Sequence, residues 1–478
     1  MSNIKIAPPE ASNNIWINGL LDGERWTSET SSVELDYSLI DTTKWKNNET
    51  PPSPYKSYSW SKLERGRIEE ALSNITSVSD ITFQNIGNNQ KNAQLRLHLV
   101  GNRTIGSRGG FAYAPDQSND NSGITAVNRD FYNSSVDSLN KKPLSGSYYG
   151  FSILHEISHS LGLKHPHDKG RFGYPKFPGI KNKGLIGLDK GRFGQNAHPY
   201  TQMTYVTEID HGELIEAERK REFGFLKTLG TLDIAAIQWL YGINPDHANE
   251  DNTYLLPTKT KPGVGWSTIW DTGGLDTVDG RGSKSSVTID LRNANLGNNK
   301  RAGGSISAVD GVMGGFTIAH DWDGKTVQQK TGMCVIENAV GGPKNDVIRG
   351  NYADNELLGG HGNDQINGGH GNDTLIGGRG KDVLKGGPGR DQFVLSKDMV
   401  DEIEDFSFED GDTITFVDST LKNKNDLEII EELSEGKPSK EFTFVSNTGE
   451  LYAWLNASTH PTSKDTPHLI AILITNPF

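Results

Sequence analysis

Three histidines and one glutamate are spaced so that they could build a catalytic metal site. His155 and His159 are four residues apart, so on a helix both imidazoles point from the same face. Glu156 follows the first histidine, where its carboxylate could reach a water molecule on the same ion. Gly162 can end the helix because glycine adopts left-handed backbone angles without steric cost, and the chain can then bring in His165. Three imidazoles and an open position are a ligand set of catalytic zinc.

The pattern over residues 155–165 is specific. Five fixed residues at fixed spacing occur by chance in a chain of this length with a probability on the order of 10⁻⁴. A surface helix whose histidines bind no metal is therefore the weaker interpretation. The pattern resembles the extended zinc motif of the metzincins.

Two residues further along the chain fit the same site. Met203 follows the zinc motif as the methionine of a Met-turn does in metzincins, where its thioether would lie beneath the histidines without binding the metal. Alone, such a methionine would be explained by packing. Tyr205 could reach the metal through its phenol oxygen, and core packing is the alternative for it.

The elements that must position these residues are indicated by apolar periodicity. Phe151, Leu154, Ile157 and Leu161 would form the buried side of the zinc helix. A helix is expected over 61–75, and an amphipathic helix over 232–241 that Gly242 ends. Strand-prone segments are Ile15–Ile17, Val33–Tyr37, Ile81–Phe83 and Leu95–Leu99, and Gly110–Pro115 suits an edge strand because it ends in proline. This order predicts an α+β domain with its metal in a cleft.

A glycine-rich stretch starting at Gly341 consists of six consecutive units of nine residues. The sixth position of each unit is acidic or an amide: Asp346, Asn355, Asp364, Asp373, Asp382 and Asp391. The eighth position is apolar: Ile348, Leu357, Ile366, Leu375, Leu384 and Phe393. This is the nonapeptide calcium repeat of a parallel β-roll. A flexible glycine-rich linker is the alternative, which six units in register disfavour.

Each repeat has a physical interpretation. Its first six residues form a turn that presents carbonyl and carboxylate oxygens, which are the hard ligands that calcium prefers, and the other three form a short strand. The residues expected at the calcium ions are Gly342, Asp346, Gly360, Gly362, Asp364, Gly369, Gly371, Asp373, Gly378, Gly380, Asp382 and Asp391. Because the aspartates repel one another, we expect the roll to stay unfolded at low calcium and to fold when several ions bind.

Composition limits the classes of function. The chain has 478 residues, which suggests two or three domains, and its net charge of -13 argues against a nucleic-acid binder. A single cysteine, Cys334, excludes an internal disulfide. The first ten residues contain no apolar segment of a signal peptide. The chain is therefore expected to be cytoplasmic or exported by a route that does not read the N-terminus.

One hexapeptide occurs twice after the zinc motif. The sequence Asp-Lys-Gly-Arg-Phe-Gly occupies residues 168–173 and again residues 189–194. We favour a local duplication in a surface loop over a binding element.

Taken together, these motifs resemble the serralysin-type metalloproteases, which are secreted bacterial metzincins with an RTX domain. The resemblance covers roughly residues 110–415 and is strongest at 149–166, 203–205, 232–242, 270–277 and 335–394. It implies an α+β zinc metalloprotease (metzincin) domain over 1–245. An all-β RTX domain of parallel β-roll and β-sandwich type would follow over 246–478, with its repeats at 341–394 and a C-terminal β cap and secretion region.

The resemblance also implies roles for individual residues. His155, His159 and His165 would bind one zinc ion, with Glu156 as the catalytic carboxylate. Tyr205 would be a mobile additional zinc ligand and Met203 the Met-turn residue. Calcium positions that flank the roll would be Asp271, Gly273, Gly274, Asp276 and Glu337.

The implied function is that of a secreted, extracellular zinc endopeptidase stabilised by calcium. Its partners would be protein and peptide substrates, a type I secretion apparatus and a proteinaceous inhibitor, with no nucleic acid, and it would be a monomer. The alternative is a calcium-dependent surface or adhesion RTX protein with a vestigial protease domain. The RTX repeats alone fit that alternative, whereas the intact zinc motif argues against it.

Overall fold

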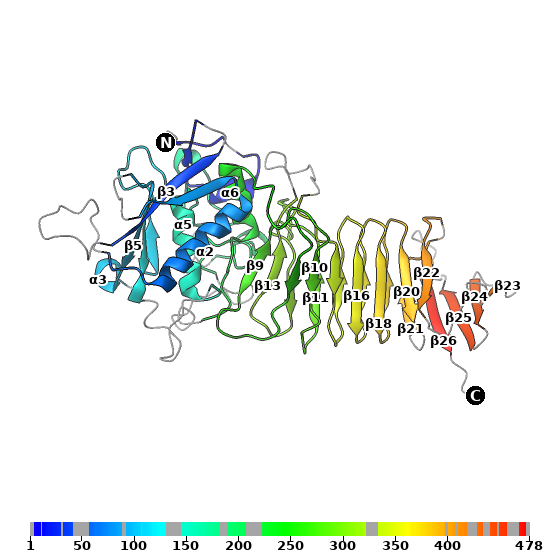
Figure 1. The fold of residues 1–478 in the computed structure, drawn as a ribbon. Helices are drawn as coiled ribbons and strands as arrows, with labels where there is room; N and C mark the ends of the chain where they lie inside the picture. The colour runs from blue at the N-terminus through cyan, green and yellow to red at the C-terminus, as the bar shows by residue number, and fades with distance from the viewer. Residues whose placement is uncertain are drawn as a thin grey trace, which may run out of the picture.

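The computed structural model describes residues 4–10, 12–29, 32–41, 57–87, 92–106, 108–130, 145–181, 189–206, 222–321, 333–396, 400–407, 409–417, 428–433, 440–446, 449–456 and 468–474. Residues 1–3, part of the segment inspected for a signal peptide, lie outside them. Figure 1 shows a region of helices and strands at the N-terminal end, followed by an elongated stack of strands that runs toward the C-terminus.

A five-stranded sheet forms the framework of the N-terminal region. Its order is β4 (Ile81–Asn85), β3 (Val33–Ile40), β5 (Leu95–Val100), β7 (Ile124–Asn128) and β6 (Gly110–Ala112). The first four strands are parallel to one another, and β6 lies antiparallel to β7 at the edge. The edge strand predicted at 110–115 is thus confirmed over 110–112, and one of its sides has no neighbouring strand within this sheet.

Two helices pack against this sheet, and a third packs against one of them. The helix α2 (Lys62–Val78) begins at a capping box in which Ser61 and Glu64 exchange hydrogen bonds, and it buries Ile68, Leu72 and Ile75. It contacts both α5 (Tyr148–Ser160) and α6 (Thr231–Tyr241), and α5 also packs on β6 and β7. Gly242 follows α6 with a φ of 85°, so the predicted helix and its end are confirmed. A short helix, α3 (Asn102–Ile105), follows β5.

The prediction of a strand at Ile15–Ile17 is wrong, because this segment belongs to helix α1 (Ile15–Leu20). The side-chain oxygen of Asn14 accepts hydrogen bonds from the backbone N–H groups of Trp16 at 2.9 Å and Ile17 at 3.2 Å. This N-cap starts the helix despite its β-branched residues. The segment is flanked by β1 (Lys5–Ala7) and β2 (Arg25–Thr27), which pair with each other.

The stacked strands form two sheets that the chain visits alternately. One sheet has the order β22 (Thr413–Val417), β20 (Gln392–Ser396), β18 (Thr374–Arg379), β16 (Glu356–His361), β14 (Asn338–Val340), β10 (Thr277–Asp279) and β8 (Thr253–Leu255). The other contains β21 (Val400–Ile403), β19 (Val383–Lys385), β17 (Gln365–Asn367), β15 (Val347–Arg349), β11 (Val287–Asp290), β12 (Ser307–Val309), β13 (Gly315–Ile318) and β9 (Trp266–Ile269). It continues beyond β21 into the antiparallel strands β26 (His468–Ile474), β25 (Gly449–Asn456), β24 (Lys440–Ser446) and β23 (Glu428–Leu433).

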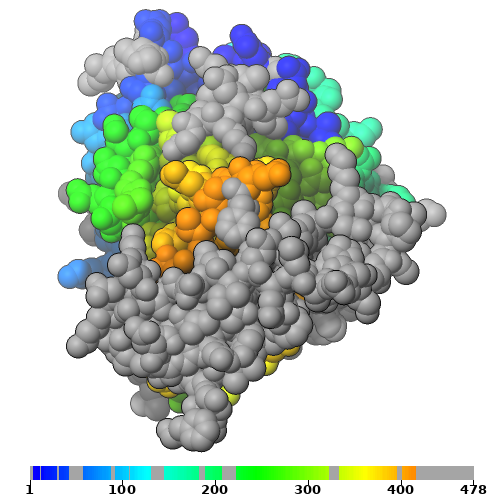
Figure 2. All heavy atoms as spheres, turned by 90° about the vertical axis from the view of Figure 1, so that its right-hand side faces the viewer, coloured from blue at the N-terminus to red at the C-terminus, as the bar shows by residue number. Residues whose placement is uncertain are grey.

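Two nonapeptides make one turn of this roll. Leu357 pairs with Leu375 in one sheet and Ile348 with Ile366 in the other, each pair being eighteen residues apart in parallel register. The six apolar residues of the eighth repeat position are all at most 2% exposed. The repeat interpretation of the sequence is therefore confirmed as a parallel-stranded structure. Figure 2 views this stack from its C-terminal end, with the yellow and orange strands of the roll in front of the N-terminal region.

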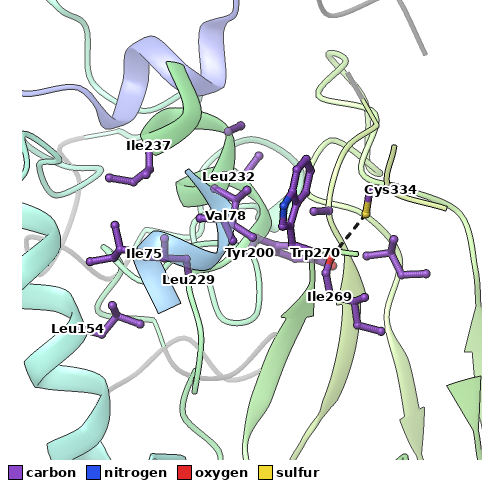
Figure 3. Close-up of a cluster of buried hydrophobic side chains, with 14 of the residues drawn as sticks. Ile75, Val78, Leu154, Tyr200, Leu229, Leu232, Ile237, Ile269, Trp270 and Cys334 are labelled. Carbon is purple, nitrogen blue, oxygen red and sulfur yellow. Dashed lines mark hydrogen bonds between the residues drawn. The ribbon is translucent and has the colours of Figure 1, made fainter. Parts of the chain in front are cut away.

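The hydrophobic core continues across the region where we predicted a domain boundary. One cluster of buried side chains extends from Trp16 to Phe406. Figure 3 shows Trp270 and Ile269 of the second region beside Leu229 and Leu232 of the first, with Cys334 close by. The division at residue 245 stays a prediction. Among the helices of the described residues, none is long and apolar enough to cross a membrane.

Candidate metal centre and its cleft

The helix α5 and the turn that follows it bring the three motif histidines together. The hydroxyl of Ser147 caps the start of the helix, which ends at Ser160. Gly162 then has a φ of 104°, and a Cβ at this position would lie 2.6 Å from the carbonyl oxygen of Glu24. Only glycine fits this turn, which directs the chain back so that His165 faces the helix.

The three imidazoles point their Nε2 atoms at one location. The Nε2 atom of His165 lies 3.2 Å from that of His155 and 3.1 Å from that of His159. Nitrogens at the corners of a tetrahedron around zinc, with bonds of about 2.0–2.1 Å, are about 3.3 Å apart. The donor set therefore fits zinc in spacing and in chemical type.

The opposite nitrogen of each ring has a partner that fixes the tautomer. The Nδ1 atom of His155 is 2.8 Å from the carbonyl oxygen of Gln202, and that of His159 is 2.8 Å from the carbonyl oxygen of Leu163. A carbonyl oxygen only accepts, so both rings donate from Nδ1 and keep an unprotonated Nε2. Burial also lowers the pKa of His159 to about 3 and that of His155 well below its ordinary value, so both rings are neutral at pH 7.

The third histidine is oriented by a carboxylate that the sequence analysis missed. The Nδ1 atom of His165 lies 2.9 Å from Oδ2 of Asp168, three residues later. His167 stacks on His165 with ring centroids 5.0 Å apart and an interplanar angle of 13°. A carboxylate close behind a histidine in the sequence was the available signal for Asp168, since metal-binding histidines commonly donate their second N–H to such a group.

Tyr205 and the segment before it complete the floor of the site. The hydroxyl of Tyr205 is 2.7 Å from Nε2 of His165, and Met203 is fully buried. Asp233, at the start of α6, holds this segment: its carboxylate accepts from the hydroxyl of Thr201 at 2.6 Å and from the backbone N–H group of Gln202. Asp233 was also missed by the sequence analysis, because its partners are more than thirty residues away.

Glu156 is only 7% exposed and lies beside the edge strand. A Cβ at Gly110 would be 2.6 Å from Cγ of Glu156, so the absence of a side chain at this position lets β6 approach the carboxylate. Burial raises the pKa of Glu156 to about 8.

A cleft of about 600 Å³ joins these groups. Its lining includes Glu156, His159, His165 and Tyr205 together with the edge-strand residues Phe111 and Ala112. The structure therefore brings together all the residues that the sequence analysis assigned to the zinc site, apart from Met203, which packs behind them in the core. The arrangement is suited to a metal-assisted reaction on a ligand lying along β6.

The repeat aspartates form two columns along the roll. The Oδ1 atom of each accepts the backbone N–H of the residue eighteen positions earlier: Asp364 from Asp346, Asp382 from Asp364, Asp373 from Asn355 and Asp391 from Asp373, at 2.8–2.9 Å. The second carboxylate oxygens of Asp364, Asp373, Asp382 and Asp391 are buried and have no hydrogen-bond partner among the described residues. A buried carboxylate oxygen without a partner is costly, so these columns fit bound cations.

The glycines of the repeats provide the turns beside these carboxylates. Gly360, Gly362, Gly369, Gly371, Gly378 and Gly380 all have φ between 102° and 147°. Other residues rarely adopt such angles. Gly342 does not, but its N–H donates to Oδ2 of Asp346 at 2.5 Å.

A further group of carboxylates precedes the roll, where the sequence analysis expected calcium. Glu337 accepts the backbone N–H of Asp276 at 2.9 Å, and the hydroxyl of Tyr254 donates to Asp271. Gly273 and Gly274 form the turn between the two aspartates, with φ of 152° and 114°. Burial and the nearby charges of Asp271 and Glu337 raise the pKa of Asp276 to about 7. These charges also favour a cation.

The columns predict an unusual pH dependence for the calcium-free roll. Burial raises the pKa of Asp364 and Asp373 to about 7 and that of Asp391 to about 6, above the ordinary carboxyl value of 3.8. It also raises to about 7 the pKa of Asp401, which accepts the backbone N–H of Asp382 at 3.1 Å beyond the last repeat. Their contribution to stability is thus fully present below about pH 4 and is lost as the pH rises through 7. In a calcium chelator, amides of residues 341–394 should be better protected from hydrogen exchange at pH 5 than at pH 8, after correction for intrinsic rates.

In saturating calcium, these amides should instead be better protected at pH 8 than at pH 5, because the ions bind the ionised carboxylates. If the protein in chelator were better protected at pH 8 than at pH 5, this result would contradict the claim that the pKa values of the column aspartates are raised.

Comparison with known proteins gives two findings. Residues 340–375 and 371–396 match the family model of the RTX calcium-binding nonapeptide repeat. The chain is 28% identical to serralysin of Proteus mirabilis over 68% of this chain and 61% of the relative, and 29% identical to metalloprotease AprA of Pseudomonas entomophila over 71% and 63%. It is 30% identical to serralysin C of Dickeya chrysanthemi over 66% and 59%. The matched region thus spans about three fifths of the length of these relatives.

Proposed function

From the relationship of this chain to serralysin-type metalloproteases with RTX repeats, we propose that it is a secreted zinc endopeptidase stabilised by calcium. The observation that carries the proposal is the convergence of three imidazole Nε2 atoms beside a buried glutamate, in a cleft bordered by an edge strand. The N-terminal region up to residue 245 would be the metzincin domain and the rest the RTX domain.

His155, His159 and His165 would hold the zinc ion. When bound, zinc supplies a Lewis acid and lowers the pKa of a bound water molecule to about 7. Glu156 accepts the proton of the attacking water and passes it to the leaving amine. Its burial excludes bulk water, so the proton passes between the reactants and not to solvent. The hydroxyl of Tyr205, beside His165, donates a hydrogen bond to the oxyanion that develops on the substrate.

The substrate would be an extended peptide that adds to β6 as a further strand. Backbone N–H and C=O groups of Gly110–Ala112 would bind its main chain, with the scissile bond between this strand and the histidines. Main-chain pairing requires no particular side chains, which suits hydrolysis of varied proteins.

Asp168 provides a test of the metal site that does not depend on activity. Its replacement by Ala should weaken zinc binding by about 10–100-fold, because His165 loses the partner that fixes its tautomer and ring orientation. Competition with a chromophoric zinc chelator measures this affinity. Asp189→Ala is the matched control, since Asp189 holds the same position in the second hexapeptide and accepts from Gly191. Equal zinc affinity in both variants would contradict the role of Asp168.

The RTX repeats alone would also suit a calcium-dependent surface or adhesion protein, because the family model matches only within residues 340–396. Casein zymography in calcium distinguishes the two functions. The endopeptidase should produce a cleared band that a zinc-selective chelator removes and added zinc restores. The absence of clearing by zinc-loaded protein would favour the adhesion function.

A further inference from the structure

Arg171, in the first copy of the repeated hexapeptide, joins three segments of the chain at the cleft. Its guanidinium contacts Oδ2 of Asp22 at 2.7 Å, Oε2 of Glu24 at 2.7 Å and Oδ2 of Asp116 at 2.8 Å. It also donates to the carbonyl oxygen of Pro115. The backbone N–H of Arg171 donates to the carbonyl oxygen of Asp22 at 2.5 Å.

These contacts border the cleft described above. Asp22, Asp116 and Arg171 line it together with His165 and Glu156. Pro115 and Asp116 follow the edge strand β6, and Arg171 follows His165 by six residues. The guanidinium thus connects the wall that continues the edge strand to the wall that carries the third histidine.

The second copy of the hexapeptide, residues 189–194, has the same sequence but does not form these contacts at the cleft. Both copies form the same short helical turn, η2 (Arg171–Gly173) and η3 (Arg192–Gly194), with a phenylalanine at positive φ: 52° at Phe172 and 57° at Phe193. Arg192, however, donates to the amide oxygen of Asn298, away from the cleft. The three-residue turn is shared, whereas the preceding glycines differ, with φ of -73° at Gly170 and 67° at Gly191, and so do the partners of the arginine.

We propose that Arg171 is a positioning residue that fixes the far end of the substrate cleft, where a long peptide would extend past β6. This inference rests on the proposed endopeptidase function. The planar guanidinium can bind several carboxylates at fixed angles, which lysine cannot do. Without it, Asp22, Glu24 and Asp116 repel one another, and residues 115–116 lose their fixed distance from the opposite wall.

The position of this junction defines which substrates depend on it. Asp116 is four residues beyond the end of β6, and a strand advances about 3.3 Å per residue. A tetrapeptide bound at the histidines stays on β6, whereas a decapeptide centred on the scissile bond reaches residues 115–116. Arg171 therefore contributes to binding of long substrates and leaves the bond-breaking step unchanged.

The test compares Arg171→Ala with Arg192→Ala on a tetrapeptide and a decapeptide with the same cleavage site. For Arg171→Ala, KM for the decapeptide should rise about tenfold with kcat unchanged, while KM for the tetrapeptide should change by less than about twofold. Arg192→Ala should behave as the wild type with both. Zinc affinity should be the same in all three proteins, which excludes damage to the metal site.

If Arg171→Ala does not fold, a milder variant can be tested in its place. Asp116→Asn removes only the carboxylate contact of the segment after β6, and it should raise KM for the decapeptide selectively, by a smaller factor. Equal KM changes for both peptides, or no difference from Arg192→Ala, would overturn this inference alone. Failure of zinc-loaded wild-type protein to cleave either peptide would reject the proposed function and this inference with it.

Discussion

Replacing Glu156 by Gln should lower kcat/KM for casein-derived peptides by at least about 10²–10⁴-fold while zinc stays bound. Glutamine fills the same buried space beside Gly110 but cannot accept the proton of the attacking water. The three imidazole Nε2 atoms are untouched, because Glu156 is hydrogen-bonded to none of their Nδ1 atoms, which are paired with Gln202, Leu163 and Asp168. Peptide cleavage and zinc content, measured on the same preparation, check both halves of the expectation.

Glu69→Gln is a suitable control for this experiment. Glu69 is exposed on α2, so the substitution changes the net charge equally without touching the cleft. It should retain full activity. Cleavage by a zinc-loaded Glu156→Gln protein at the wild-type rate would contradict the assignment of Glu156 as the proton acceptor.

The second large effect is expected from removal of calcium. A chelator should unfold the roll near neutral pH, because four buried carboxylate oxygens would be left without partners. Each ion bound at a hundredfold excess over its Kd stabilises the folded state by about 2.7 kcal/mol, so the loss of several ions exceeds the stability of a typical domain. Circular dichroism during a calcium titration should show the β-sheet signal appear as calcium rises.

Two aspartate variants make this expectation residue-specific. Asp373→Asn replaces a buried carboxylate of one column and should shift the calcium midpoint to higher concentration. Asp354→Asn alters an exposed residue whose oxygen accepts the backbone N–H of Asn372, a contact that an amide oxygen preserves, and should shift the midpoint less than Asp373→Asn does. A spectrum that does not respond to the chelator would contradict the calcium requirement.

The parts of this fold that the sequence predicts are those with a local or periodic cause. The roll follows from a repeat whose apolar position recurs every nine residues, and the turn after α5 follows from the steric freedom of Gly162. The edge strand was marked by Pro115. The helix α1 was mispredicted because a single cap at Asn14, and packing of Trp16 in the core, outweigh β-branched residues on either side.

The missed residues act across loops, where the sequence has no period to show it. Asp233 binds residues 201–202. Arg171 binds Asp22 and Glu24, which are 149 and 147 residues earlier in the chain, and Asp116, which is 55 residues earlier. Asp168 lies three residues from its partner, but proximity in a loop does not specify a hydrogen bond. Repetition of the hexapeptide was visible in the sequence; the different partners of its two arginines required the structure.

The eighteen-residue turn has a consequence for how the roll can change in length. Asp364, Asp373, Asp382 and Asp391 each accept the N–H of the residue eighteen positions earlier, so within the repeats each column is built from turns of equal length. Loss of one nonapeptide would move every later unit to the opposite sheet and join two columns that start at different positions. Loss of two nonapeptides removes one turn and leaves both columns in place. Within residues 341–394, the roll can therefore lose or gain nonapeptides and keep both columns in register only if they change in pairs.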